Sequence, residues 1–570
     1  MLFATLPSRG AKLAANPLTR SLALGLLAAT ISGCTGAPPP TDGTGTGPDA
    51  HATDQGPADM LVVATGSDIN TMIPIVSTSV GDSQVFSHIY LDGVNGVFDC
   101  QLNYQPALYE SWEWSDDSLQ LTLKMRQDIK WSDGEPVTAH DVAFTYEAIG
   151  MTDVASPRYA YTRDYAEPAT ALDDYTVRFS WKNPGDRITR LAQSAAYVIP
   201  KHKLASALPN LGDNPLATNP LANGPFRLGK RQAGQYFTLE PNPDFSGPDE
   251  WKAHLKLVRF QIVPEYQTRL LKLKKGEVDL MEGIKVKDAD ELKKSNPNLR
   301  LVRRGYRFMD YIAWNLNDKR FQDKQVRTAM AYAVDIDGMI DKLLTGEDGT
   351  RYGQQAVGTI TPEICSVKAD FDPIKQNVET AKKMLADAGW KDTNGNGIID
   401  KDGVEMSFTL LTNKENDRRR QASQLVQAQL KEVGIDMKLD LIEFNAMTKR
   451  LQARDFEAVL GGWSAGLFVD PSPFWHSGEE YHFNYPSYAN ADVDALIDKA
   501  LATPDPDEAA PIWKEMQQQV YEDQPYMFLW WRDEIVAIDN RFENTDIDIS
   551  SLTHNLNKWS VPADKVKYRL

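Results

Sequence analysis

The strongest constraint on the fold is the alternation of strand and helix patterns along residues 406–460. Short apolar runs of strand character are separated there by longer segments with the apolar spacing of an amphipathic helix. The pattern predicts strands at 406–411, 437–442 and 456–460 and helices at 418–433 and 446–453. Because neighbouring parallel strands need a crossover connection, such a βαβαβ run implies a largely parallel sheet covered by helices.

The rest of the chain contains both antiparallel and α/β patterns. Strands at 119–125 and 175–181 alternate strictly between apolar and polar residues, as half-exposed antiparallel strands do. Further strands are predicted at 61–65, 257–263, 278–281 and 311–316, and further helices at 266–275, 323–334 and 378–388. An early antiparallel part and a later α/β part fit several lobes better than a single sheet.

Length and charge narrow the class of protein. The chain has 570 residues, which exceeds one hydrophobic core and predicts several domains. A hydrophobic content of 42% excludes a largely disordered protein. The formal net charge of -18 argues against nucleic acid as a partner, because phosphate binding needs a basic face.

Residues 1–33 have the pattern of an export signal. An apolar run at 21–31 is too short to span a membrane and follows three basic residues, Arg9, Lys12 and Arg20. The sequence Ile31-Ser-Gly-Cys34 resembles the lipobox of bacterial lipoproteins, in which the cysteine becomes the acylated first residue. We therefore expect the signal to be removed and Cys34 to carry the lipid that anchors the protein to the cell membrane.

Residues 34–59 comprise the lipidated cysteine and a predicted flexible tether. The tether is rich in Gly, Pro and Thr and holds no large apolar residue, so it cannot bury enough surface to fold. We expect the folded part to lie outside the cytoplasm, at the cell surface or in the periplasm. An exported location permits a disulfide between Cys100 and Cys365, but the sequence gives no distance between them, and two free buried thiols are the alternative.

Several motifs in a shared order carry a resemblance to a known family. Residues 123–134, Leu-Lys-Met-Arg-Gln-Asp-Ile-Lys-Trp-Ser-Asp-Gly, continue into Glu-Pro-Val-Thr-Ala-His-Asp-Val-Ala-Phe at 135–144. This stretch resembles the signature of the family 5 extracellular solute-binding proteins, the oligopeptide-, dipeptide- and nickel-binding group of ABC importers. Further matching pieces follow at 223–226, 273–279, 326–335, 381–389 and 429–435.

The resemblance implies a fold and a function. The family folds as two α/β lobes of the class II periplasmic-binding-protein type, joined by two crossings, with an extra antiparallel subdomain on the first lobe. Here the first lobe would comprise 60–92, 222–304 and 527–570, the subdomain 93–221, and the second lobe 305–526. The lobes of such a receptor close on a small solute by hinge bending and deliver it to the membrane permease of an ABC importer. The resemblance thus implies a monomeric receptor without enzymatic activity or a required cofactor.

Residues 463–470 are the predicted wall of the ligand cleft. In the resembled family a Trp followed by Asp-Pro borders the ligand, which makes candidates of Trp463, Ser464, Gly466, Phe468 and Asp470. Peptide binders carry an Asp three residues after that Trp to pair with the ligand's amino group, and this chain has Gly466 there. Either Asp470 replaces the carboxylate or the ligand has no amine. A peptide is the first expectation, and an oligosaccharide or a metal chelate is the alternative.

Other cleft candidates follow from the same resemblance. Dipeptide binders hold the ligand carboxylate with an Arg after an earlier strand, where this chain offers Lys414. Aromatic faces suit peptide side chains and sugar rings alike. The aromatic candidates are Tyr90, Tyr306 and Trp530; Trp314 fits the core better, and one of the adjacent Trp530 and Trp531 should point to core.

The segment 462–466 also matches G-x-S-x-G, the nucleophile elbow of α/β-hydrolases. A surface lipoprotein hydrolase would use Ser464 as nucleophile and His554 as base. The elbow must lead into a helix, however, and Pro471 and Pro473 oppose one. The chain is therefore expected not to be an enzyme.

Residues 392–400 match the first half of an EF-hand calcium loop. The expected ligands are Asp392, Asn394, Asn396, Ile398 and Asp400. Gly403 stands at the twelfth position, where a bidentate Glu is usual, so a structural ion or a plain Asn/Gly turn are the two possibilities. The histidines show no zinc spacing, although His476 and His482 flank the cleft loop and could serve a metal chelate.

Overall fold

The computed structural model describes residues 60–77, 79–478 and 483–568. All of them belong to one compact unit. No helix in this part of the chain is long and apolar enough to cross a membrane. The predicted export signal, Cys34 and the tether lie outside the described residues, as does His482.

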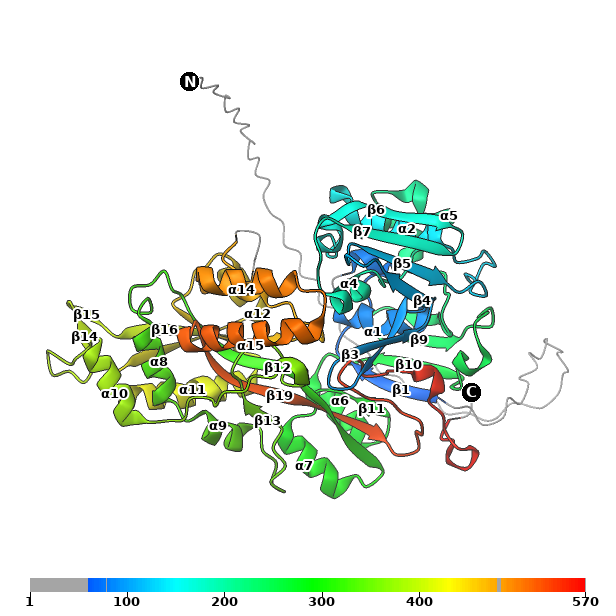
Figure 1. Ribbon diagram of the computed structural model, residues 1–570. Coiled ribbons are helices and arrows are strands. Elements are labelled where there is room, and N and C mark those ends of the chain that lie inside the picture. The colour runs from blue at the N-terminus through cyan, green and yellow to red at the C-terminus, as the bar shows by residue number, and fades with distance from the viewer. Residues whose placement is uncertain (1–59, 78, 479–482, 569–570) are drawn as a thin grey trace, which may run out of the picture. The chain divides into compact units, whose positions relative to one another are not determined.

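Two long antiparallel strands, β12 (Leu299–Trp314) and β19 (Tyr526–Asp539), run side by side through the centre of an 11-stranded mixed sheet (Figure 1). Strand β19 pairs with β12 on one side and with β11 (Leu280–Met281) on the other. The two lobes therefore share one hydrogen-bonded sheet, contrary to the expectation of separate sheets, because the crossing strands are long enough to pair in both. The other strands of this sheet are β1 (Met60–Thr65), β8 (Phe226–Gln232), β9 (Tyr236–Pro241), β10 (Leu257–Ile262), β13 (Gly353–Gln355), β16 (Ser407–Asn413), β17 (Asp436–Ile442) and β18 (Ala458–Ser464).

The predicted βαβαβ run is confirmed in the second lobe. Strand β16 is parallel to both β17 and β18, and α11 (Asp417–Glu432) and α12 (Phe444–Gln452) are the crossover helices. One face of the sheet packs against α11 together with α8 (Lys324–Ala333), α9 (Ile336–Leu343) and α10 (Val378–Asp387). The other face packs against α12, α13 (Ser472–Trp475), α14 (Ala491–Leu501) and α15 (Pro506–Asp523) (Figure 1).

The antiparallel subdomain is also confirmed. Its sheet has the order β4-β5-β7-β6, formed by β4 (Tyr109–Trp114), β5 (Gln120–Met125), β7 (Thr176–Trp181) and β6 (Tyr165–Asp173). Beside it lies the hairpin of β2 (Val94–Phe98) and β3 (Leu102–Pro106). Its core is continuous with that of the first lobe, since Phe179 of β7 and Phe226 of β8 belong to one apolar cluster.

Shorter helices complete the first lobe and its subdomain. Helix α2 (Ala139–Gly150) begins in a capping box, in which the Thr138 N–H donates to Asp141. The remaining helices are α1 (Val80–Ile89), α3 (Ala160–Arg163), α4 (Arg187–Gln193), α5 (Lys201–Leu204), α6 (Tyr266–Lys274) and α7 (Val286–Ser295). A small hairpin of β14 (Asp400–Lys401) and β15 (Val404–Glu405) projects from the second lobe.

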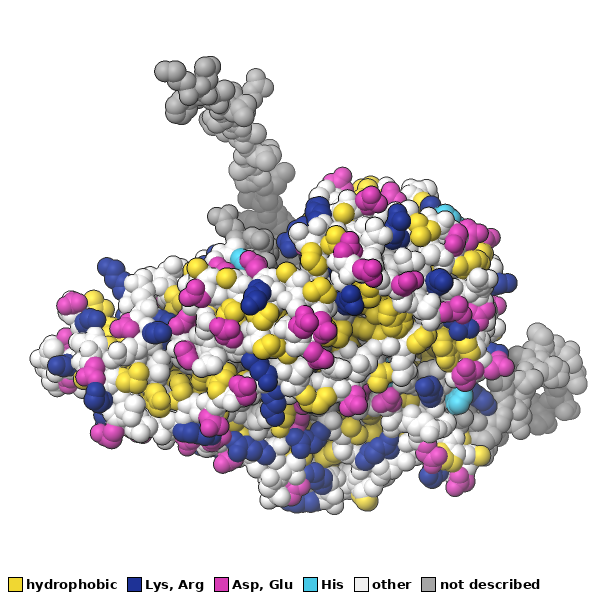
Figure 2. All heavy atoms as spheres, in the orientation of Figure 1, with side chains coloured by type: hydrophobic (Ala, Val, Ile, Leu, Met, Phe, Trp, Pro, Cys, Tyr) yellow, Lys and Arg dark blue, Asp and Glu magenta, His cyan; other side chains and the backbone are white. Residues whose placement is uncertain are grey.

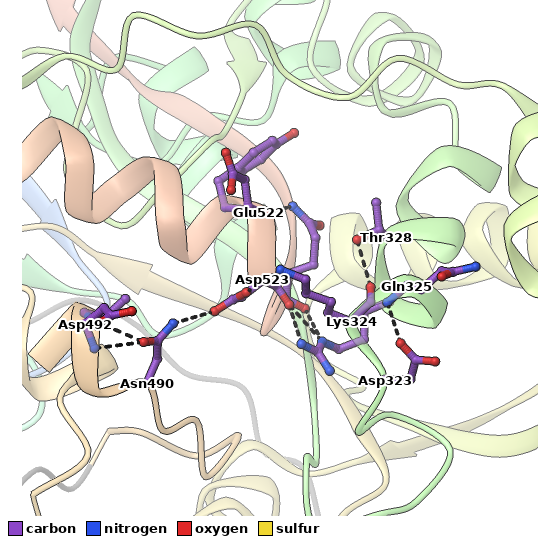
Figure 3. A network of polar contacts seen from close by, with 12 residues as sticks. Asp323, Lys324, Gln325, Thr328, Asn490, Asp492, Glu522 and Asp523 are labelled. Atoms are coloured by element: carbon purple, nitrogen blue, oxygen red, sulfur yellow. Dashed lines mark hydrogen bonds and ion pairs between the residues drawn. The ribbon is translucent and has the colours of Figure 1, made fainter. Parts of the chain in front are cut away.

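A polar network fixes the end of α15 next to α8. The Asp523 carboxylate accepts hydrogen bonds from the Tyr488 hydroxyl at 2.8 Å and from Asn490 at 2.9 Å. Figure 3 shows Asp523 at the centre of this network, facing Asn490 and Lys324. The buried Arg327 of α8 donates to the main-chain oxygens of Phe321, Gln322, Asp523 and Gln524. These contacts join two helices that cover opposite faces of the sheet.

Acidic and basic side chains are interspersed over the face seen in Figure 2. This face therefore offers no continuous basic surface of the kind that nucleic acid requires.

Candidate functional site

Three consecutive arginines occupy the first turn of α11, at residues 418–420. The dipole of a helix disfavours cations at its N-terminus, so these side chains need acidic partners. Asp310 of β12 supplies one: its carboxylate accepts from Arg418 Nε at 2.7 Å and from Arg419 Nε at 3.1 Å. Trp530 Nε1 of β19 donates to the same carboxylate at 2.9 Å. Strands of both crossings and a second-lobe helix thus meet at Asp310.

The group around Asp310 carries a net positive charge. Burial would raise the pKa of Asp310, but Arg418 and Arg419 outweigh it and hold the pKa well below its usual range. Arg532 also faces this carboxylate, and burial together with repulsion from Arg418 lowers the pKa of its guanidinium to about 9. Its Cζ lies 4.6 Å from the Phe308 ring centre, and within the described residues its buried Nε has no hydrogen-bond partner. One carboxylate therefore faces three guanidinium groups, an arrangement that favours an added anion.

Gly462 is required by this packing. A Cβ atom there would lie 2.6 Å from the Met309 oxygen and 2.7 Å from Asp310 Oδ1, and would also collide with Arg419. The first glycine of the G-x-S-x-G match thus has a structural reason that is unrelated to a nucleophile.

Trp463 lies in an aromatic cluster at the end of β18. Its ring stacks on Tyr311 at 5.8 Å between centroids and on Tyr485 at 5.7 Å, and its Nε1 donates to the Tyr526 hydroxyl at 3.4 Å. Phe483 contacts the same ring and is 44% exposed. The indole is thus partly buried and held in one orientation, as the apolar wall of a binding site requires.

The loop after β18 leaves several of the predicted residues accessible. Ser464 is the last residue of the strand and is exposed, as are Gly466 and Phe468. Asp470 is engaged: its Oδ1 accepts from the Ser472 N–H at 3.1 Å and from the Ser472 hydroxyl, which fixes the start of α13. The sequence suggested that Asp470 could pair with the amino group of the ligand, but its carboxylate already holds Ser472.

The hydrolase geometry is not formed. Ser464 pairs with Phe308 across the strands and is followed by an irregular loop; the next helix starts at Ser472 and has four residues. A nucleophile elbow needs a tight strand-to-helix turn at the serine. His554 lies instead at a first-lobe cavity, 3.8 Å from Asp546, and no hydrogen bond links it to Ser464 among the residues with described positions.

The remaining candidates separate into open and buried positions. Lys414 is exposed just beyond β16, and Tyr306 is half-buried on β12 with its N–H donating to Glu363 at 2.9 Å. Tyr90 is 3% exposed and donates to the Met72 oxygen, and Trp530 is 0% exposed. Both are core residues here, so the structure does not support a ligand contact for either. Trp530 and Trp531 do point to opposite faces, but each face is core, as it is for Trp314.

Of two cavities in the described part of the chain, the smaller touches the predicted cleft wall at 463–470 and the larger does not. One of about 180 Å³ lies inside the first lobe, against His88, Asp92, Trp251 and His554. Another, of about 50 Å³, lies between the subdomain and the second lobe and is lined in part by Phe468.

The loop at 392–400 is organised by its own turns. Asp392 accepts from the N–H groups of Gly395 and Gly397, at 2.7 and 2.9 Å, while Asp400 accepts from Thr393. The Asn394 and Asn396 side chains each accept from the N–H two residues on, the latter from Ile398. The described residues contain no group of three or more acidic, histidine or cysteine side chains that could hold a metal ion.

Cys100 and Cys365 form a disulfide with a Cα–Cα distance of 5.1 Å. This decides between the two states that the sequence left open. His476 Nε2 lies 3.4 Å from Asp498, so its ring is engaged with an acidic neighbour.

Comparisons with known proteins agree on one family. Residues 103–484 match the family model described as "Bacterial extracellular solute-binding proteins, family 5 Middle". The chain is 30% identical over 504 residues to the oligopeptide-binding protein AppA of Bacillus subtilis, covering 85% of this chain and 91% of AppA. It is 27% identical over 512 residues to the probable D,D-dipeptide-binding periplasmic protein DdpA of Escherichia coli, covering 86% and 92%.

Solved structures show the same fold. The structure of Bacillus subtilis AppA in complex with a nonapeptide matches with a TM-score of 0.74 at 29% identity, covering 89% of this chain and 100% of that one. NikZ from Campylobacter jejuni in complex with Ni(L-His) matches with a TM-score of 0.75 at 23% identity, covering 88% and 100%. The two-lobed periplasmic-binding-protein fold is confirmed.

Proposed function

The chain belongs to the bacterial extracellular solute-binding proteins, family 5, and from this membership we propose that it captures a peptide between its lobes and delivers it to an ABC permease. AppA and DdpA, with high coverage of both chains, are named for oligopeptide and dipeptide binding. NikZ binds a nickel–histidine complex, but at 23% identity it supports the fold alone. Peptide is therefore the proposed ligand, ahead of an oligosaccharide or a metal chelate.

The proposal rests on the positive group around Asp310, which lies on the face of the sheet covered by α11, while the Trp463 aromatic cluster lies on the opposite face of the same strands. The Arg532 Nε is buried and no described residue accepts from it, so a ligand carboxylate would have to approach this group past the partly exposed Arg418 side chain. Trp463 follows Gly462 on β18 and points to the other face of the sheet, so the apolar wall and the positive group lie on opposite sides of the same strands. Gly466 offers no carboxylate, and Asp470 is engaged by Ser472. We therefore expect the peptide to be anchored mainly by its carboxyl end.

Calorimetry with matched synthetic peptides tests this proposal. Free-acid peptides should bind at least about tenfold more tightly than their C-terminal amides, because a charge-assisted hydrogen bond contributes about 1.5–3 kcal/mol. Arg532→Met should abolish the difference. The control is Arg420→Met, since Arg420 is half-buried and its ion pair within the described residues is with Asp417, at 2.9 Å. Equal binding of acid and amide would refute carboxylate anchoring.

We propose no enzymatic activity for the chain. The test incubates wild type and Ser464→Ala with ester substrates. Turnover that the substitution removes would overturn a receptor-only function.

We propose that Cys34 carries the lipid anchor and that the receptor is a monomer at the outer side of the cell membrane. The lipobox-like sequence Ile31-Ser-Gly-Cys34 supports the lipid anchor. Cys34→Ala should move the protein from the membrane fraction to the soluble fraction. Unchanged membrane association would reject the lipid anchor.

For the loop at 392–400 we propose a weak structural calcium site. The missing twelfth-position Glu and the turn hydrogen bonds that already hold Asp392 favour dissociation constants on the order of 10⁻⁴–10⁻³ M. Calcium titration of wild type against Asp392→Asn is the measurement. If neither protein releases or absorbs heat on calcium addition, the loop binds no calcium and is a plain turn.

A further inference from the structure

The β2–β3 hairpin is attached to both lobes. At its base, Val94 and Tyr104 pack in the apolar cluster shared by the first lobe and its subdomain. Near its tip, Phe98 packs against the second-lobe cluster that contains Tyr311. The tip residue Cys100 is bonded to Cys365 of the second lobe, and the Cys365 N–H donates to the Cys100 oxygen at 2.8 Å.

Besides the disulfide and the Phe98 packing, two main-chain hydrogen bonds cross this contact. The N–H of Asp186 donates to the Leu501 oxygen at 3.3 Å, and the N–H of Arg187 to the Pro504 oxygen at 3.2 Å. Figure 1 shows the N-terminal end of α15 beside α4 and β3 at this place. The cavity of about 50 Å³ lies here too, between the hairpin, α4 and the second lobe. Two hydrogen bonds of 3.2–3.3 Å and the packing of Phe98 contribute little individually, so the disulfide is the strongest single link across this contact.

The disulfide therefore closes a second connection between the lobes. The first is the pair of crossing strands, β12 and β19, about which a hinge motion would turn. A bond away from these strands restricts the motion, because the second lobe cannot leave the subdomain by more than the hairpin can bend. Each hairpin strand has five residues, a reach of roughly 17 Å.

We propose that the Cys100–Cys365 disulfide makes the β2–β3 hairpin a strap that limits the opening of the lobes. The strap rests on the proposed function only in assuming that the lobes open and close. Ligand then enters and leaves a cleft that opens partially, and exchange is slower than in the same protein without the bond. An extracytoplasmic location keeps such a bond oxidised.

The test uses ligand-free full-length protein, so its result does not depend on which ligand the protein binds. Wild type is compared with Cys100→Ser/Cys365→Ser and with the control Asp99→Asn, which alters the exposed hairpin tip but keeps the bond. Small-angle scattering reports lobe separation, and hydrogen exchange reports the amides of Cys365, Asp186 and Arg187. We expect the double variant alone to show a larger radius of gyration and about tenfold or faster exchange at these amides.

Equal scattering and equal exchange in all three proteins would overturn the strap, as would fast exchange at these amides in wild type. Should the double variant fail to fold, folded wild type is compared before and after dithiothreitol. One dithiothreitol thiolate attacks a bridge sulfur and the other closes the oxidised ring, so that both cysteines leave as thiols. Both cysteines are exposed, which gives the reductant access to the bond. An unchanged radius of gyration after complete reduction would likewise refute the proposal.

Discussion

Replacing Asp310 by asparagine removes the one negative charge that faces three guanidinium groups at the strand crossing. Asp310 is 1% exposed and accepts from Arg418, Arg419 and Trp530, all within 3.1 Å. Removing one partner of a buried ionic group typically costs about 3–5 kcal/mol, because the other charges stay buried without compensation. We expect a loss of this size in the free energy of unfolding. The anion-favouring character of the site should increase, so binding of free-acid peptides should not weaken.

The assay is urea unfolding followed by circular dichroism, with the slope of each transition checked because a two-lobed protein can deviate from two-state behaviour. Asp417→Asn is the matched control: its pairs with Lys285, at 3.0 Å, and with Arg420, at 2.9 Å, are half-exposed, and each should contribute no more than about 1 kcal/mol. A loss below about 1 kcal/mol for Asp310→Asn would refute the reasoning.

Asp310→Asn should also change how the free energy of unfolding depends on pH. The folded-state pKa of Asp310 lies below its unfolded value of about 3.9, so its contribution is complete above that pH and falls as the pH drops toward the folded-state pKa. The difference between wild type and Asp310→Asn should therefore be constant from pH 7 to about pH 5 and shrink below about pH 4. If the difference in unfolding free energy between wild type and Asp310→Asn shrank as the pH rose above 5, the pKa of Asp310 would not be lowered in the folded state.

Three further changes test other parts of the structure. Arg327→Met should lower the free energy of unfolding in urea by about 2–4 kcal/mol, because it leaves four main-chain oxygens without their donor. The control Lys324→Met removes an exposed pair with Asp523 and should change that free energy by no more than about 1 kcal/mol. Equal losses for the two variants would contradict this prediction. Gly462→Ala should cost about 1–3 kcal/mol through its collision with the Asp310–Arg419 contact, and an unchanged midpoint would show that the contact yields freely. Trp463→Ala should weaken peptide binding at least about tenfold in calorimetry with little loss of cooperative folding, and unchanged affinity would remove Trp463 from the site.

Periodic segments of the fold could be predicted from the sequence because their apolar residues follow the local geometry. The strand predicted at 437–442 is observed as β17, and the helix predicted at 378–388 as α10. The strand predicted at 311–316 begins twelve residues earlier, at Leu299, as β12. Arginines interrupt the apolar alternation in that extension, and their partners, such as Asp533 and Glu534 on β19, are distant in sequence.

The site was only partly predictable for the same reason. Trp463 has a sequence context that marks it, whereas Asp310 and Arg532 become a site only when β12 and β19 pair. One signal was present: three arginines at the start of a predicted helix oppose its dipole and imply an acidic partner elsewhere. Tyr90 and Trp530 had no comparable signal, because an aromatic residue beside a predicted cleft has the same sequence pattern whether it lines the cleft or the core.

Native mass spectrometry of the protein purified from its own cells would identify the ligand that it carries. A solute receptor of this family whose site favours a carboxylate should carry peptides with free carboxyl ends, and Arg532→Met should lose them while remaining folded. A sugar or a metal chelate in their place, or peptides retained equally by Arg532→Met, would contradict the account.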